Sequence, residues 1–217
     1  MDWGPLPALE WLALAERELL LFAGVFFLIG ALDELLVDIC WAWLKLTGRA
    51  RTRRISRASI MRRPLRGPPA ILVPAWNEAA VIGHMVAHTL RAWPQAELRL
   101  FVGCYPNDPA SATAVVAGAA GDARVRLVMV GHDGPTTKAD CLNHLYAAME
   151  REERGRGEPF RMVLLHDAED MVDPAALPLI DAALDDADYV QLPVLPIPQP
   201  RSRWIGSHYC EEFAEAH

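Results

Sequence analysis

Short apolar runs alternate with helical stretches from residue 70 onward, and this alternation constrains the fold more than any other feature. Strands are expected at residues 70–73, 98–104, 124–130, 161–166 and 188–195. Helices are expected between them, at residues 78–91, 109–120, 138–153 and 174–184. Strands separated by helices need crossover connections, which produce a mostly parallel sheet with helices on both faces. The sequence therefore predicts an α/β fold.

Polar clusters follow four of the expected strands. They read PAWNE, YPND, GHDGPTTK and HDAED, at residues 74–78, 105–108, 131–138 and 166–170. Ligands of open parallel sheets bind beyond the carboxyl ends of the strands, so these clusters should meet at one rim. We predict a binding site at that rim.

The densest group of carboxylates follows the fourth expected strand, in MVLLHDAEDMVDPAAL at residues 162–177. Asp167 and Glu169 are spaced so that a turn lets both approach one divalent cation, although an isolated triplet of this kind also fits a solvated surface. Mg2+ and Mn2+ prefer such oxygen ligands. Asp170 is expected to be solvated or to support the ligands. Asp173 precedes a proline and is expected to cap a helix.

Two further rim residues have both a structural and a functional interpretation. Asp108 also precedes a proline, which favours an N-cap, and this role is compatible with ligand binding. Lys138 opens a helix after GPTT, where backbone amides and a lysine favour phosphate, although solvated lysines are equally common there. Asn77 is expected to cap the first helix of the α/β region, with Glu78 favourable to its dipole.

The N-terminal region contains a long apolar segment. Residues 19–32, LLLFAGVFFLIGAL, carry no charge, and Asp33, Glu34 and then LLVDICWAWLKL follow. A membrane-spanning helix needs about 20 mostly apolar residues, so a span must include the acidic positions or begin earlier. Three interpretations stay open: a transmembrane helix, an uncleaved signal-like or interfacial helix, and a core helix of a soluble protein.

A basic run at residues 45–66, KLTGRARTRRISRASIMRRPLR, follows the apolar segment. Residues 1–66 contain ten Arg or Lys against seven Asp or Glu, whereas residues 67–217 contain eleven against twenty-one. Such a run is common in nucleic-acid binding, but its position beside an apolar segment favours membrane lipid as the partner and no nucleic acid. The positive-inside rule then places the residues after it in the cytoplasm.

Several common sites are excluded. The four cysteines show no CxxC spacing, which argues against a zinc site or a disulfide framework. The chain contains no GxGxxG, GxxxxGK[ST] or GxSxG motif. His84, His88, His144 and His166 are expected to be surface or packing residues.

Four ordered motifs resemble the inverting family 2 glycosyltransferases of the GT-A fold, in their membrane-bound polysaccharide synthase branch. LVPAWNEAAVI is similar to the family's first strand and turn, with Trp76 where tyrosine is usual. YPNDP takes the place of an acidic turn whose aspartate recognises uracil, and TTKADCLN is similar to a helix start whose lysine lies near the diphosphate. LHDAED stands where the family has DxD, with glutamate replacing the second aspartate.

The resemblance implies specific roles. Asp167 and Glu169 would hold Mg2+ or Mn2+ as the cofactor. The residues that would bind the nucleotide-sugar donor, UDP-linked by this resemblance, are Pro74, Trp76, Glu78, Asp108, Lys138 and Asp167. The family's catalytic base and its QxxRW motif are not recognisable before His217, so both are expected beyond it, in a longer protein.

The resemblance also implies an organisation and a location. Residues 1–48 would form a membrane segment, 49–69 a basic juxtamembrane linker, and 70–217 the incomplete GT-A domain. The protein would lie in the bacterial inner membrane, with its catalytic domain in the cytoplasm, and pass a sugar to a glycan acceptor. Two alternatives remain: a nucleotidyltransferase, for which the glycine-rich basic loop after the first strand is missing, and a non-catalytic nucleotide-binding membrane scaffold.

Overall fold

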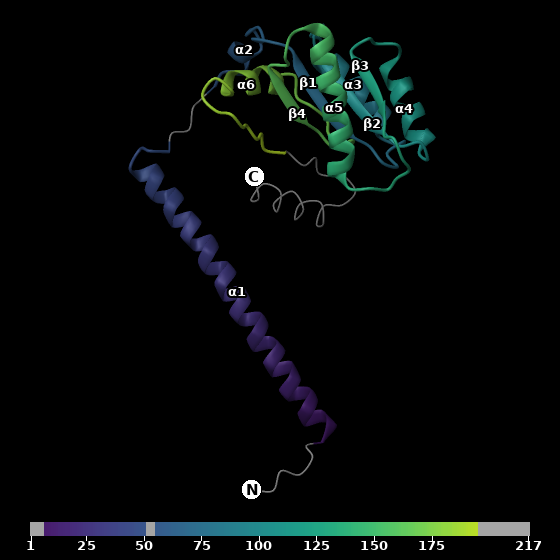
Figure 1. Cartoon of the computed structure of the whole chain (residues 1–217). Helices are drawn as coiled ribbons and strands as arrows, with labels where there is room; N and C mark the ends of the chain where they lie inside the picture. The colour runs from purple at the N-terminus through teal and green to yellow at the C-terminus, as the bar shows by residue number, and fades with distance from the viewer. Residues whose placement is uncertain (1–6, 51–54, 195–217) are drawn as a thin grey trace, which may run out of the picture. The chain divides into compact units, whose positions relative to one another are not determined.

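A computed structural model describes residues 7–50 and 55–194 of the 217-residue chain. The chain divides into two compact units, with the boundary between Arg54 and Ile55. The first unit is a helix and the second is an α/β domain (Figure 1).

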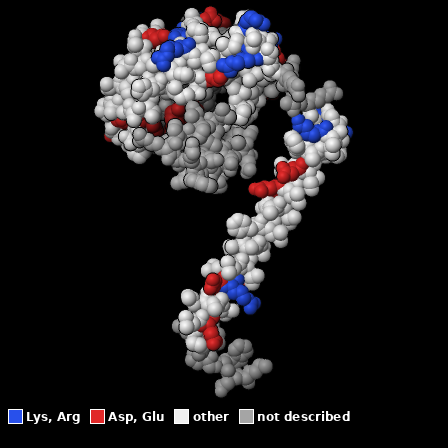
Figure 2. All heavy atoms as spheres, turned by 180° about the vertical axis from the view of Figure 1, so that it is seen from behind, with Lys and Arg blue, Asp and Glu red and all other residues white. Residues whose placement is uncertain are grey.

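Helix α1 extends from Ala8 to Leu46 without a break. Its 39 residues correspond to a length of about 58 Å at 1.5 Å per residue, against a hydrocarbon thickness of about 30 Å. Its large apolar side chains are exposed along the helix, as the uncharged surface between its charged zones shows (Figure 2). This exposure disfavours a core helix of a soluble protein. Helix α1 is long and apolar enough to cross a membrane.

The second unit is built on a four-stranded parallel sheet (Figure 1). The strands are β1 (Pro69–Pro74), β2 (Arg99–Cys104), β3 (Val125–Met129) and β4 (Met162–Leu165), in the order β3-β2-β1-β4. In the register of the sheet, Leu72 of β1 lies opposite Phe101 of β2 and Leu165 of β4. The first four expected strands are confirmed.

Helices cover both faces of this sheet, as expected. Four of them are α3 (Ile82–Ala92), α4 (Pro109–Ala119), α5 (Lys138–Arg156) and α6 (Ala176–Ala183). Apolar residues of α3, α4 and α6 pack with Ile71 and Val73 on one face. Residues of α5 pack with Leu72 and Phe101 on the other face. Because β1 and β2 are covered on both faces, their residues are apolar almost without alternation.

Helices α3 and α4 approach closely because glycine lies at their contact. A Cβ added to Gly118 would stand 2.2 Å from the carbonyl oxygen of Gly83, and a Cβ on Gly83 would stand 2.8 Å from that of Ala114. Only glycine permits backbones this close. The turns before the two helices, both part of the predicted rim, are joined by hydrogen bonds from the Asn77 amide to Asp108 at 2.7 Å and from the Glu78 amide to the Ser111 hydroxyl at 2.9 Å.

Two helices begin later than expected. Helix α3 begins at Ile82, not at residue 78, and Asn77 does not cap it: Asn77 adopts a left-handed turn with φ 58°. Helix α6 begins at Ala176, with Ala175 at its N-cap position. Asp173 accepts a hydrogen bond from the Ala175 amide at 2.7 Å, so it closes the turn before the helix and is not the N-cap.

The expected strand at residues 188–195 is wrong within the part that the structure describes. Residues 188–194 form no strand there, and residue 195 lies outside the described residues. Pro193 has no amide hydrogen to donate to a neighbouring strand, which disfavours a place within a sheet for this apolar run. Strand β4 is therefore an edge of the described sheet.

Residues 55–66 of the basic run belong to the second unit and pack within it. Residues Arg57–Ile60 form a short helix, α2, whose Ile60 is buried. Arg57 pairs with Asp173 at 2.9 Å, and Arg63 pairs with Asp185 at 2.7 Å. These arginines, expected to serve a membrane-adjacent linker, are bound to acidic residues around α6.

Candidate functional site at the carboxyl ends of the strands

A cavity of about 210 Å³ lies at the carboxyl ends of β1 and β4. In the order β3-β2-β1-β4, strands β2 and β3 are added on one side of β1 and β4 on the other, so the strand order reverses between β1 and β4, which is where open α/β sheets bind ligands. Six of the predicted site residues line the cavity. They are Pro74, Trp76, Glu78, Lys138, Asp167 and Glu169.

Asp108, the seventh, lies beside the cavity and is not part of its lining. It is the N-cap of α4, as expected, and its Oδ1 accepts a hydrogen bond from the Ser111 amide. Its Oδ2 accepts one from the Asn77 amide at 2.7 Å. Burial alone would raise the pKa of Asp108, but the hydrogen bonds from Ser111 and Asn77 lower it below its usual value. Asp108 thus holds the loop after β1 in place, and its contact with a ligand stays a prediction.

Two aromatic rings form one wall of the cavity. Trp76 and Tyr105 meet edge to face, with ring centroids 5.3 Å apart. Gly134 packs against this wall, and a Cβ added there would lie 2.6 Å from the Trp76 ring. A residue without a side chain is therefore required for the loop before α5 to reach the aromatic pair.

The N-terminus of α5 also lines the cavity. Thr137 caps the helix by accepting a hydrogen bond from the Asp140 amide. Lys138 is the first helical residue, and its ammonium group forms an ion pair with Asp167 across the cavity. A helix N-terminus with an adjacent lysine offers amide dipoles and a positive charge, the combination that binds phosphate groups.

Three carboxylates, Glu78, Asp167 and Glu169, line the cavity; we call them the rim carboxylates. Burial raises the pKa of Glu78, and the charges of Glu169, Asp108 and Asp167 raise it further. Among the described residues, Lys138 is the only lysine or arginine that pairs with a rim carboxylate. The rim carboxylates therefore create a negative potential with oxygen donors, which suits a hard divalent cation.

Asp170 has a supporting role at this site. A hydrogen bond with His166 lowers the pKa of Asp170, and the Asp167 amide donates a second bond to Asp170 at 3.0 Å. These contacts fix the turn that presents Asp167 and Glu169. Between them, Ala168 is buried, so the turn directs the two carboxylates outward around a small residue.

The cavity also contains residues that the sequence did not single out. They are Ala75, Tyr105, Thr136, Thr137, Cys141 and Ala168. All of these except Cys141 lie within the polar clusters that follow the strands, which is a usable signal. Cys141 lies inside α5 and carries no such signal. Burial raises the pKa of its thiol, which keeps it protonated and unreactive at neutral pH.

A four-stranded parallel sheet of this order, with its cavity at the reversal point, defines a Rossmann-like α/β domain. Residues 67–217 match the sequence profile of the glycosyltransferase like family 2. The chain belongs to glycosyltransferase family 2, which confirms the resemblance and the fold class.

The chain is also similar to two curated proteins of Escherichia coli. It is 34% identical over 221 aligned residues to the bacteriophage adsorption protein B of strain K12. It has the same identity to the bacteriophage N4 adsorption protein B of strain O157:H7. Its sequence after Asp188 also resembles this type of protein, and the comparison confirms that resemblance. The alignment covers all of this chain but 29% of each relative.

Proposed function

We propose that the chain binds a nucleotide-sugar, UDP-linked by the family resemblance, together with Mg2+ or Mn2+, for glycosyl transfer to a glycan acceptor. The observation that carries this proposal is the cavity at the reversal point of the sheet. The cavity is lined by an aromatic pair, by the N-terminus of α5 with Lys138, and by the rim carboxylates. This combination provides a surface for a base, charge for phosphates and oxygen ligands for a cation.

The rim carboxylates fit the divalent cation that this family commonly uses. Asp167 and Glu169 would hold it, since both are exposed and project from the turn fixed by Asp170. A bound cation would supply Lewis-acid neutralisation of the diphosphate and a template for its orientation. Lys138 adds positive charge from the α5 side, while Trp76 and Tyr105 exclude water from one side of the donor.

We further propose that α1 anchors the chain in the bacterial inner membrane, with the α/β unit in the cytoplasm. The support is the apolar exposure of α1 and the arginines that follow it, which orient a span by the positive-inside rule. The end of α1 carries aromatic and basic residues in contact: Lys45 lies 5.3 Å from the Trp41 ring centroid, and Arg49 lies 4.7 Å from that of Trp43. Such residues concentrate at membrane interfaces.

The binding of donor is tested with the full chain in detergent by calorimetry. UDP should bind in the presence of Mn2+ and lose roughly tenfold or more in affinity when the metal is removed. Asp167→Asn should cause a loss of the same size without unfolding the domain, because Asp167 is exposed. Glu97→Gln is the matched control, since Glu97 is exposed at the opposite end of the sheet, just before β2.

Two results would overturn the proposal. One is equal UDP affinity with and without metal. The other is an Asp167→Asn chain that binds UDP and Mn2+ as tightly as the Glu97→Gln control.

A further inference from the structure

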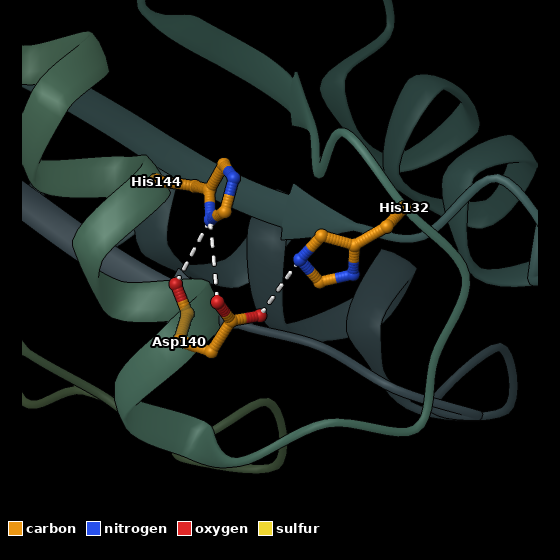
Figure 3. A group of neighbouring side chains, drawn as sticks. All are labelled: His132, Asp140 and His144. Atoms are coloured by element: carbon orange, nitrogen blue, oxygen red, sulfur yellow. Dashed lines mark hydrogen bonds and ion pairs between the residues drawn. The ribbon is translucent and has the colours of Figure 1, made fainter.

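A second group of metal-ligating side chains lies outside the cavity. His132 stands in the loop between β3 and α5, and Asp140 and His144 lie one turn apart on the first part of α5 (Figure 3). The three potential ligand atoms lie within 4.8 Å of one another. None of these residues lines the cavity.

The side chains point toward a shared space (Figure 3). His132 Nε2 lies 3.3 Å from Asp140 Oδ2, and His144 Nδ1 lies 3.9 Å from Asp140 Oδ1. The two rings are nearly perpendicular, with centroids 5.5 Å apart, so they approach the carboxylate from different directions. Three ligands that converge on one point from different directions are what a tetrahedral centre requires.

We propose that His132, Asp140 and His144 bind a divalent transition metal of the Zn2+ type. Two imidazoles and one carboxylate form a donor set that suits Zn2+, Ni2+ or Cu2+ better than the hard cations favoured by the rim carboxylates. Ligand atoms of tetrahedral zinc lie about 3.3 Å apart, as bonds of about 2.0 Å imply. The His132 side chain is 48% exposed, so a small rotation closes the set.

Neighbouring hydrogen bonds already orient Asp140. The Thr136 hydroxyl donates to Asp140 Oδ2 at 2.8 Å, and Thr136 in turn shares a hydrogen bond of 2.6 Å with the Tyr105 hydroxyl. His144 Nδ1, when it carries the ring proton, donates a hydrogen bond to the Asp140 carbonyl oxygen at 3.0 Å, which places this nitrogen beside the carboxylate. Metal binding through Nδ1 would replace this bond and requires the tautomer with its proton on Nε2. Such outer contacts fix ligand geometry in metal sites.

The site has a structural consequence for the cavity. A metal held by His132 and Asp140 ties together the two ends of the segment between them, and this segment contains Thr136, Thr137 and Lys138 of the cavity lining. The three protein ligands leave a fourth position open for water or a ligand oxygen. The metal would therefore fix the phosphate-binding side of the cavity without contacting the rim carboxylates.

The test uses the full chain in detergent, without an affinity tag, after removal of bound metal by a chelator. Titration with Co2+ and Zn2+ in excess Mg2+, which occupies the rim carboxylates, should show one further site by visible absorption of Co2+ and by calorimetry. His132→Ala and His144→Gln should each weaken binding by roughly tenfold or more. His132 is exposed in a loop, so its replacement does not threaten folding.

Two controls separate this site from others. His84→Ala removes an exposed histidine of α3 and should leave Co2+ affinity unchanged. Asp167→Asn should also leave it unchanged, even though it disturbs the binding proposed for UDP and Mn2+. The site is refuted if His132→Ala and His144→Gln bind Co2+ like wild type, or if Asp167→Asn alone abolishes binding. Failure of UDP binding with Co2+ binding intact would contradict only the proposed function.

Discussion

Two groups of acidic residues in the second half of the chain have opposite surroundings. The rim carboxylates face a cavity and one cation, Lys138. A second group, Asp173, Asp181 and Asp185, surrounds α6; we call these the α6 carboxylates. Each of the α6 carboxylates pairs with at least one arginine.

The arginines of the α6 group come from distant parts of the chain. Arg57, Arg63 and Arg66 belong to the basic run, and Arg161 precedes β4. The ion pairs of Arg57, Arg63 and Arg66 hold the segment before β1 against the α6 carboxylates. Asp181 is fully buried, and its Oδ2 accepts a hydrogen bond from the Arg66 amide at 3.2 Å.

This difference distinguishes carboxylates that hold the fold from carboxylates available to a ligand. A buried acid with compensating partners is costly to remove, because its partners are left unpaired. At the rim, by contrast, the charges of Glu169 and Asp167 raise the pKa of Glu78, so the negative charge of this group is not fully compensated by cations. Perturbed acids in a cleft are candidates for function for that reason.

The largest expected loss of stability comes from Asp181→Asn. The substitution removes the charge that faces Arg161 Nε at 3.6 Å inside the domain. Breaking a fully buried pair costs about 3–5 kcal/mol, and we expect about 2 kcal/mol because the Arg161 side chain is 32% exposed. Urea unfolding of the full chain in detergent, followed by near-UV circular dichroism, measures the change.

Asp188→Asn is the control for this substitution, because Asp188 is exposed and should change stability by less than about 0.5 kcal/mol. An Asp181→Asn chain as stable as this control would show that the α6 carboxylates do not hold the fold.

A smaller loss is expected from Arg57→Met. Its pair with Asp173 is exposed on both sides, at 62% and 53%, and pairs of this kind contribute less than about 1 kcal/mol. The same unfolding measurement at low and high salt checks this, since screening should reduce the difference between wild type and variant. A loss equal to that of Asp181→Asn would remove the distinction between buried and exposed members of the group.

The Arg57 pair also has a pH signature. The hydrogen bond from Arg57 lowers the pKa of Asp173 below 3.8 in the folded chain. The stability it contributes is fully present above pH 3.8 and is lost as the pH falls through the folded pKa. Wild type and Arg57→Met should therefore differ in stability at neutral pH and converge in acid. A difference that grows below pH 3.8 would contradict the pairing.

Much of the fold follows from local sequence. The four strands and the helices between them were predictable, because the strands appear as short apolar runs and the helices as longer stretches between these runs. The start of α3 was not predictable, since the amide of Asn77 is bound by Asp108, which is 31 residues away in the chain. The expected fifth strand shows the limit of apolar content as a signal, because Pro193 interrupts its hydrogen bonding.

The side chains likewise separate into those that local sequence predicts and those that depend on distant partners. The rim residues follow directly after strands, and sheet topology alone brings them together. The roles of the α6 carboxylates depend on partners more than 100 residues away, such as Arg57 and Asp173, which are 116 residues apart. The sequence predicted a surface or packing role for His144, because its spatial neighbour His132 lies in the loop before α5 and not on the same helix face. Contacts of this kind arise only from the tertiary fold.

The smallest expected effect on stability comes from Glu169→Gln at the rim. The charge of Glu169 is the largest charge effect that raises the pKa of Glu78, so its removal relieves repulsion and breaks no ion pair described in the structure. We expect the free energy of unfolding to change by less than about 0.5 kcal/mol, with a slight rise at low salt. Binding of UDP with Mn2+ should weaken in the same variant, whereas Glu97→Gln should change neither quantity. If Glu169→Gln instead destabilises the chain as much as Asp181→Asn, the rim carboxylates hold the fold as the α6 carboxylates do, and the contrast between the two groups fails.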